Sequence, residues 1–190
     1  LLEGVEGCVF ENGRWQLEEG EYHSIDVTPF VVVDVETTGG RASKDRLIEI
    51  GAFTVCGGRV VDSIMAMVNP GRHIPLHISK LTGIYDEHVL HSPPAAEILP
   101  RYLNFISDGV FVGHNARFDY GFINSELARA GLPPMRNEML CTIKLTRRVF
   151  PGEPSYGLDH LIKKFGFDLD PVERHRGHGD AWATAELLIR

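Results

Sequence analysis

The stretch VVVDVETTGG, residues 31–40, places two acidic residues inside an otherwise apolar, strand-like segment. Side chains two positions apart on a strand point to the same side, so Asp34 and Glu36 project together from this element. Two carboxylates in such a position repel each other and lose hydration, which is costly unless a positive charge lies between them. The segment therefore predicts a core strand that carries a cation site on one side.

Bulk composition fits a single globular module. The chain has 190 residues, of which 43% are hydrophobic and 24% charged, and no linker-like or low-complexity stretch divides it. No apolar run approaches the roughly 20 residues of a membrane-spanning helix, so we expect no membrane partner. The three cysteines form no CxxC pair, which argues against a disulfide framework or a structural zinc site and favours a reducing cytoplasm.

The two ends of the sequence suggest a piece cut from a longer protein. It begins at Leu1 without a methionine and stops within the helix-like AWATAELLIR. Near the start, short apolar segments flank Asn12-Gly13, a dipeptide typical of hairpin turns. We expect residues 1–28 to form a hairpin extension, consistent with the remnant of a preceding domain, and residues 29–190 to form the main domain.

Hydrophobic periodicity predicts an α/β fold with a mixed sheet. Three apolar segments with short turns predict an antiparallel meander: 30–35, 47–55 and 59–70. A fourth strand at 109–115 precedes a helix at 116–131, which implies a crossover and a strand added in parallel. Further helical segments are expected at 78–84, 95–106 (with a kink or a break at Pro100), 141–150, 157–166 and 180–190.

Two more acids lie where core residues are expected. Asp119 shares a helical stripe with Ile123 and Leu127, and Asp180 lies at the start of the last helix on the face of its apolar residues. Four oxygen donors without cysteine suit Mg²⁺ or Mn²⁺, and a pair of such ions can promote in-line phosphoryl displacement by water.

The net charge of −7 at first argues against a nucleic-acid partner, because phosphates attract lysine and arginine. Two bound divalent cations would neutralise four of the acids locally. The net charge alone therefore does not decide whether the partner is a nucleic acid. A base for the water is still required, and the connection before Asp180 offers His175 and His178, between which the residues alone do not choose.

Three segments in this order, DVETTG, HNARFD and HRGHGDA, resemble the three motifs of the DEDDh 3′-to-5′ exonucleases. Within that family the sequence is most similar to the proofreading (epsilon) subunits of bacterial DNA polymerase III, over residues 30–190. The resemblance implies an RNase H-like fold, a mixed β-sheet flanked by helices. It also implies two Mg²⁺ or Mn²⁺ ions and the release of nucleoside 5′-monophosphates from a 3′ end.

Carried over position by position, the resemblance makes Asp34, Glu36, Asp119 and Asp180 the metal-binding acids. The family places its histidine five residues before the last aspartate, which selects His175 as the general base and leaves His178 second. Residues at the matched substrate positions are expected to contact the terminal nucleotide: Thr37, Thr38, Gly39, Leu81, Thr82, Asn115 and Phe118.

The resemblance favours DNA 3′ ends as substrate, with proofreading or repair as the role. It suggests a DNA polymerase partner or additional domains of the same chain. An RNase T-like or oligoribonuclease-like enzyme for RNA ends is the alternative, since the motifs do not distinguish the sugars. A noncatalytic binding module on the same fold is a third possibility, but such a module would need neither the acids nor the histidine.

Overall fold

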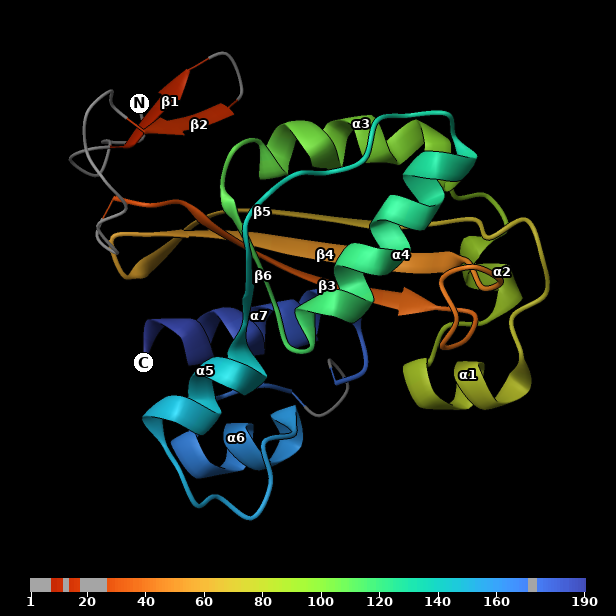
Figure 1. Ribbon diagram of the computed structural model, residues 1–190. Coiled ribbons are helices and arrows are strands. Elements are labelled where there is room, and N and C mark those ends of the chain that lie inside the picture. Colours follow the sequence, from red (N-terminus) through yellow and green to blue (C-terminus); the bar gives the residue numbers. More distant parts are fainter. Residues whose placement is uncertain (1–7, 12–13, 18–26, 171–173) are drawn as a thin grey trace.

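The computed structural model describes residues 8–11, 14–17, 27–170 and 174–190 (Figure 1). Its strands are β1 (Cys8–Glu11), β2 (Arg14–Leu17), β3 (Phe30–Thr37), β4 (Leu47–Cys56), β5 (Arg59–Met67), β6 (Val110–Gly113) and β7 (Met139–Cys141). Its helices are α1 (Leu76–Thr82), α2 (Asp86–Val89), α3 (Ala95–Ile106), α4 (Ala116–Arg129), α5 (Thr142–Val149), α6 (Leu158–Phe165) and α7 (Gly177–Ile189).

A five-stranded mixed sheet in the order β5-β4-β3-β6-β7 forms the centre of the molecule. β3, β4 and β5 pair antiparallel, whereas β6 and β7 are added in parallel beside β3. The antiparallel meander and the parallel addition are therefore confirmed. β3 lies in the middle of the sheet, so its carboxylates project from the best-supported strand of the fold.

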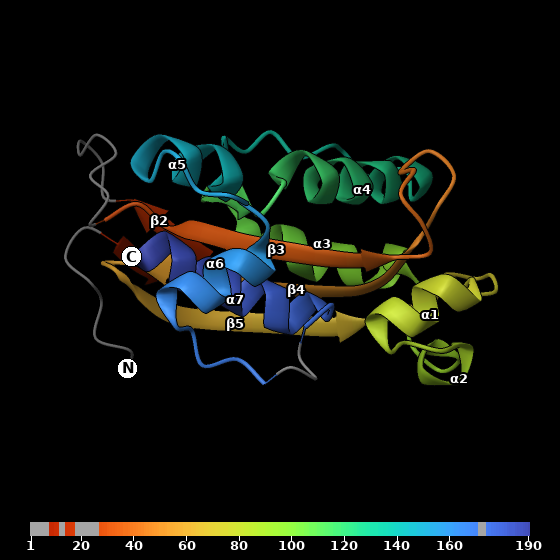
Figure 2. The same cartoon turned by 90° about the horizontal axis from the view of Figure 1, so that it is seen from below.

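Helices cover both faces of the sheet, as Figures 1 and 2 show. On one face, α3 and α4 pack against alternate residues of β3, including Val31, Val33 and Val35. On the other face, α7 packs through Ala181 and Ala185 against the intervening strand positions. This alternation follows from the two-residue period of a strand, and it leaves β3 buried on both sides.

Some boundaries differ from those expected. α3 runs unbroken through Pro100, so of the two alternatives, a kink or a break, the break is wrong; Pro100 is exposed, and the buried side of the helix packs on the sheet. β7 was missed because three residues are too few to show a period. α7 begins at Gly177, three residues earlier than expected, because its first turn lies directly on β4.

The expected N-terminal hairpin is present as the antiparallel pair β1 and β2, while its turn, Asn12-Gly13, lies outside the described residues. Whether residues 1–28 form a unit apart from residues 29–190 stays a prediction. In the part of the chain that the structure describes, no helix is long and apolar enough to cross a membrane.

Candidate active site

Three carboxylates from β3 and α7 come together on one side of the sheet. Ligand oxygens of Asp34, Glu36 and Asp180 all lie within 4.8 Å of one another. Asp180 is 8% exposed in the first turn of α7, and Asp34 and Glu36 are half-buried. The fourth predicted acid, Asp119, is 3% exposed and close enough to raise the pKa of Asp34 by repulsion. The structure thus brings all four predicted acids to one place.

Asp119 is positioned by the junction between β6 and α4. Its Oδ1 accepts a hydrogen bond from the backbone N–H of Val35, 3.2 Å away on β3. A side chain at Gly113 would place its Cβ 2.9 Å from the Cα of Ala116 and 3.0 Å from Asp119 Oδ2. Glycine at this point therefore allows α4 to start close enough to the sheet for Asp119 to reach β3.

Asp180 is brought to β3 by a close approach of two glycines. A Cβ on Gly51 of β4 would lie 2.4 Å from the carbonyl oxygen of Gly177, and a Cβ on Gly177 would lie 3.2 Å from the carbonyl oxygen of Asp34. The first turn of α7 therefore rests directly on the backbone of the sheet. Any side chain at these positions would move Asp180 away from its two partners.

Three of the four acids are poorly compensated by the protein itself. Burial raises the pKa of Asp34 well above the usual carboxylate range, and repulsion from Asp119 and Glu36 adds to this rise. Burial, followed by repulsion from Glu49 and Asp119, raises the pKa of Glu36 to about 8. Burial raises the pKa of Asp119 to about 8 as well, although the Val35 N–H acts in the opposite direction.

One basic side chain partly offsets this repulsion. Arg174 contacts Asp180 through Nη1 and donates from Nε to Asp159 Oδ1 at 2.8 Å. That hydrogen bond lowers the pKa of Asp159, whereas the lowering effect of Arg174 on Asp34 is smaller than the rise caused by burial. Arg174 therefore does not fully offset the repulsion among the acids, and a further positive charge would stabilise their ionised forms.

The donor set fits hard divalent cations. Among the described residues, the group able to hold a metal consists of carboxylates alone, without cysteine or histidine. Oxygen donors favour Mg²⁺ or Mn²⁺ over zinc, and a divalent ion would stabilise the ionised form of acids whose pKa burial has raised.

The two candidate histidines occupy different surroundings. His175 is half-buried in the connection just before α7, with a positive φ of 57°. His178 lies inside α7, and its ring packs 4.9 Å from that of Phe53 on β4. It lines a hollow of about 410 Å³ together with Met65 and Trp182, and the four predicted metal-binding acids are not part of that lining. Packing thus accounts for His178 without a catalytic role.

The loop after β3 carries three residues predicted to contact substrate. Thr37 is buried and donates its hydroxyl hydrogen to the carbonyl of Gly39 at 2.7 Å. Thr38 is 2% exposed; its Oγ1 accepts from the Arg46 N–H at 3.0 Å, and its own N–H donates to the Arg46 carbonyl. A Cβ on Gly39 would lie 2.7 Å from Asp45 Oδ2. These contacts shape the loop, and glycine at position 39 leaves room for the Asp45 carboxylate.

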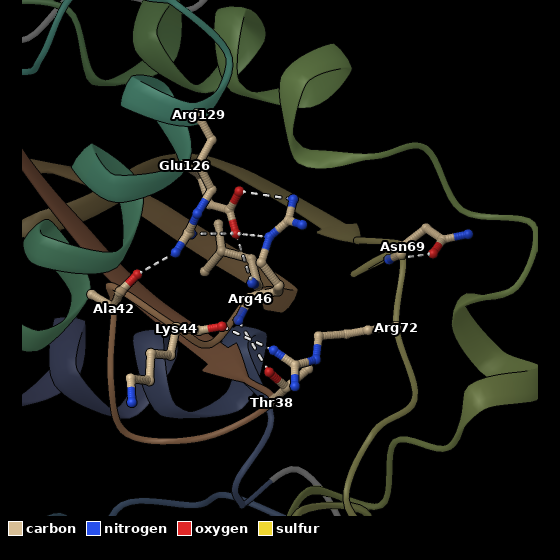
Figure 3. A network of polar contacts seen from close by, with 10 residues as sticks. Thr38, Ala42, Lys44, Arg46, Asn69, Arg72, Glu126 and Arg129 are labelled. Atoms are coloured by element: carbon tan, nitrogen blue, oxygen red, sulfur yellow. Dashed lines mark hydrogen bonds and ion pairs between the residues drawn. The ribbon is translucent and has the colours of Figure 1, made fainter.

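Glu126 fastens this loop to α4 (Figure 3). Its carboxylate receives Arg46 Nε at 2.7 Å and Nη2 at 3.1 Å, and Arg129 Nη1 at 3.1 Å. Arg129 also donates to the Ala42 carbonyl at 2.6 Å. Because the Glu126 side chain is only 1% exposed, the contact forms a buried link between the loop and the helix that carries Asp119.

The next two predicted substrate residues lie at the end of α1. Leu81 is 53% exposed, an unusual position for a large apolar side chain. Thr82 is 3% exposed, donates its hydroxyl hydrogen to the Ile78 carbonyl at 3.0 Å and accepts from the Ile84 N–H at 3.1 Å. Leu81 is therefore available to a ligand, whereas the Thr82 side chain supports the turn beneath it.

The last two predicted substrate residues lie at the start of α4. Asn115 is exposed and precedes the helix with a φ of 85°. Phe118 is half-buried, with its ring 4.8 Å from that of Phe122. Nearby His114, expected to be structural, forms a hydrogen bond between Nδ1 and Thr142 Oγ1 at 3.0 Å, and burial lowers its pKa to about 4.

Two buried carboxylates were missed by the reading of the sequence. Glu49, in LIEIGAFTV, is fully buried on β4 and pairs with Arg176. Glu126 lies two turns after Asp119 on the same face of α4. A lone acid within a buried strand was the signal for Glu49, and it is the same signal that singled out Asp34 and Glu36.

Comparisons with known proteins agree with this geometry. Residues 31–188 match the exonuclease family RNase_T. DNA polymerase III subunit epsilon of Aquifex aeolicus is 40% identical over 161 residues, which cover 85% of this chain and 79% of that protein. The PolC-type DNA polymerase III of Clostridium perfringens is 37% identical over 188 residues, 99% of this chain. The chain spans only 13% of that polymerase.

Solved structures of exonucleases also resemble this chain. Exonuclease X in complex with 5′ overhanging duplex DNA is 31% identical, with a TM-score of 0.68 over 84% of this chain and 89% of that one. Exonuclease I of E. coli with a dT13 oligonucleotide gives a TM-score of 0.77 over 85% of this chain and 40% of that one, at 19% identity, and shows the fold alone. With the RNase H-like sheet, the acid cluster and these matches together, the chain belongs to the exonuclease family.

Proposed function

We propose that this protein is a metal-dependent 3′-to-5′ exonuclease that hydrolyses DNA and releases nucleoside 5′-monophosphates. The observation that carries the proposal is the convergence of Asp34, Glu36 and Asp180 within 4.8 Å, with Asp119 beside them. A structural protein gains nothing from such a group, since it costs stability unless a cation is bound.

The four acids would hold two Mg²⁺ or Mn²⁺ ions. When bound, such ions promote ionisation of a water and offset the charge that develops at the phosphorus and on the departing 3′ oxygen. Asp34, Glu36, Asp119 and Asp180 come from β3, α4 and α7, so three packed elements fix the donor positions. This rigidity favours correct placement of the reacting groups.

The chain itself would supply the base and the substrate contacts. His175 accepts the proton of the attacking water, a role that suits an imidazole in the connection that leads to Asp180. The half-buried backbone of Gly39 approaches the terminal nucleotide, and Leu81, whose side chain is 53% exposed, stacks against or separates the last base. Asn115 and Phe118 complete the wall of the pocket; Thr37, Thr38 and Thr82 hold it in shape.

The related proteins suggest the cellular process in which this exonuclease acts. Matches to DNA polymerase III subunit epsilon and to PolC-type polymerases favour a polymerase partner or fused polymerase domains, and thus proofreading in the cytoplasm. A bifunctional exonuclease/endonuclease protein of Mycobacterium tuberculosis, 40% identical over 173 residues, makes repair the second setting. The exonuclease domain would comprise residues 29–190, with residues 1–28 as an extension.

The test is digestion of 5′-labelled single-stranded DNA and RNA of one sequence, with Mg²⁺, Mn²⁺ or EDTA. We expect a ladder that shortens from the 3′ end, requires metal and is faster on DNA. Asp34→Asn should abolish it, whereas Glu97→Gln, an exposed acid on α3, should leave it unchanged. Faster loss of RNA would reassign the substrate, and no cleavage by folded, metal-bound protein would favour a noncatalytic module.

The base assignment has its own test. His175→Ala should lower kcat by about 10²- to 10⁴-fold with little change in DNA binding, the usual range for loss of a general base. His178→Ala is the matched control, because that ring packs on Phe53, and it should keep most of the activity. Equal losses in both variants would contradict the assignment.

A further inference from the structure

Glu49 is a buried acid to which the proposed mechanism assigns no role. It lies on β4, directly opposite Glu36 in the β3–β4 register, and its side chain is 0% exposed. A carboxylate in such a position requires strong hydrogen bonds or a cation. It stands beside the metal-binding acids, yet it has a protein partner of its own.

That partner is the segment immediately after His175. Arg176 donates to Glu49 from Nε at 3.1 Å and from Nη2 at 2.7 Å, a two-point contact of guanidinium with carboxylate. The backbone N–H of Gly177 donates to Glu49 Oε2 at 2.7 Å. Gly177 is the first residue of α7, so Glu49 also satisfies an N–H that the helix itself leaves unpaired.

His175 depends on this attachment for its position. Its φ of 57° lies in the left-handed region, which is uncommon for residues other than glycine, although histidine is among those found there more often. Among the described residues, the His175 side chain forms no hydrogen bond that would orient the ring directly, although its charge adds to the effect of the Arg174 hydrogen bond in lowering the pKa of Asp159. The position of the imidazole therefore depends on the backbone of His175, which is bonded directly to Arg176, the residue that Glu49 holds.

Asp180 is less dependent on the same contact. It lies within α7, whose buried Ala181 and Ala185 pack against the sheet. The helix thus has an apolar attachment of its own, whereas His175 precedes the helix and lies outside that packing. Loss of the Glu49 contact should therefore displace His175 more than Asp180.

We propose that Glu49 is a positioning residue that, through Arg176 and Gly177, holds His175 in line with the attacking water. This inference rests on the proposed function, in which His175 is the base. The inference predicts that Glu49 affects the chemical step only through the position of His175. A purely structural Glu49 would instead affect stability, metal binding and all activity alike.

The experiment is a double-mutant cycle between Glu49→Gln and His175→Ala, measured as single-turnover hydrolysis of single-stranded DNA with Mg²⁺ in the full chain. Glu49→Gln alone should lower kcat by about 10- to 100-fold with KM within about twofold, as expected for displacement of a reacting group by up to 1 Å. In the His175→Ala background the same substitution should change the rate by less than about twofold.

Glu126→Gln is the matched control, because Glu126 is likewise a buried carboxylate held by arginines. It holds the loop after β3 instead, so its effect should fall on KM and persist without His175. If Glu49→Gln fails to fold, Arg176→Met is used in the same cycle, since the Arg176 side chain is 31% exposed and its loss leaves no cavity in the core.

Each outcome separates the two proposals. The positioning role is overturned if Glu49→Gln lowers the rate by the same factor in the parent and in His175→Ala, or if it leaves kcat unchanged. Either result leaves the proposed nuclease function standing. Full activity of His175→Ala overturns the base assignment. Full activity of Asp34→Asn, measured beside them, overturns the proposed function itself.

Discussion

Gly51 offers a direct test of how the active site is assembled. It lies on β4 beneath the first turn of α7, which begins at Gly177 and contains Asp180. A Cβ there would lie 2.4 Å from the Gly177 carbonyl oxygen, 2.5 Å from its carbonyl carbon and 2.7 Å from the His178 nitrogen. All three are backbone atoms, so no side chain can rotate away, and Gly51→Ala must move α7 away from the sheet.

The size of the effect follows from these distances. Ordinary contact begins at 3.4 Å, so the helix must move by 3.4 − 2.4 = 1.0 Å along the line of the closest contact. A displacement of about 1 Å in a reacting geometry lowers the rate by about 10²-fold, or about 2.7 kcal/mol of activation free energy. Overpacking should also destabilise the fold by about 1–3 kcal/mol, which lowers Tm by roughly 2–12 °C.

The assay is kcat on single-stranded DNA at a temperature well below the melting transition, with folding checked by circular dichroism. Gly121→Ala is the matched control: it lies within α4, and an added Cβ would meet no atom within 4 Å. That variant should keep its kcat and gain about 0.5–1 kcal/mol, since alanine favours a helix over glycine. A folded Gly51→Ala with activity within twofold of the parent would refute the reasoning.

Three further predictions follow. Because Glu36 and Asp119 have pKa values raised to about 8 when folded, the folded metal-free protein retains protons that the unfolded chain releases. Its urea-unfolding free energy in EDTA should fall from pH 5 to pH 8, and Mg²⁺ should reverse that fall; a rise would contradict it. Glu126→Gln should raise KM for DNA severalfold with kcat nearly unchanged, because it frees the Gly39 loop. Leu81→Ala should raise KM while changing stability by less than about 0.5 kcal/mol, as Leu81 is 53% exposed; calorimetry measures the second quantity.

Sequence-based prediction was most successful where an acidic residue occupies a position that the local pattern assigns to an apolar core residue. Asp34 and Glu36 stood out because acids two apart on an apolar strand must face the same way, and the structure places both in the cluster. Asp119 and Asp180 stood out by sharing helical faces with apolar residues, and both are buried. Whether these acids bind metal, and whether His175 is the base, stay predictions for the assays above.

Glu49 illustrates where local reasoning stops. Its position in an apolar strand breaks the same rule as Asp34, yet its partner is Arg176, 127 positions later. A strand pattern shows that a buried carboxylate must be compensated; it does not say whether a metal ion or an arginine does so. Thr38 is a similar case: it was expected to place a backbone or hydroxyl group at the substrate, and its hydroxyl accepts a hydrogen bond from the Arg46 backbone.

By itself, the sequence determined all the described strands except β7, most of the helices, the order of the sheet's antiparallel meander and the identity of the four acids. These follow from side-chain periods of 2 and 3.6 residues, which are local properties of the chain. Only the tertiary structure decided that β3, α4 and α7 meet at one point, that Gly51 and Gly177 touch, and that Glu49 holds the segment after His175. Contacts between residues so far apart depend on how closely packed elements approach each other, and no local pattern encodes that distance.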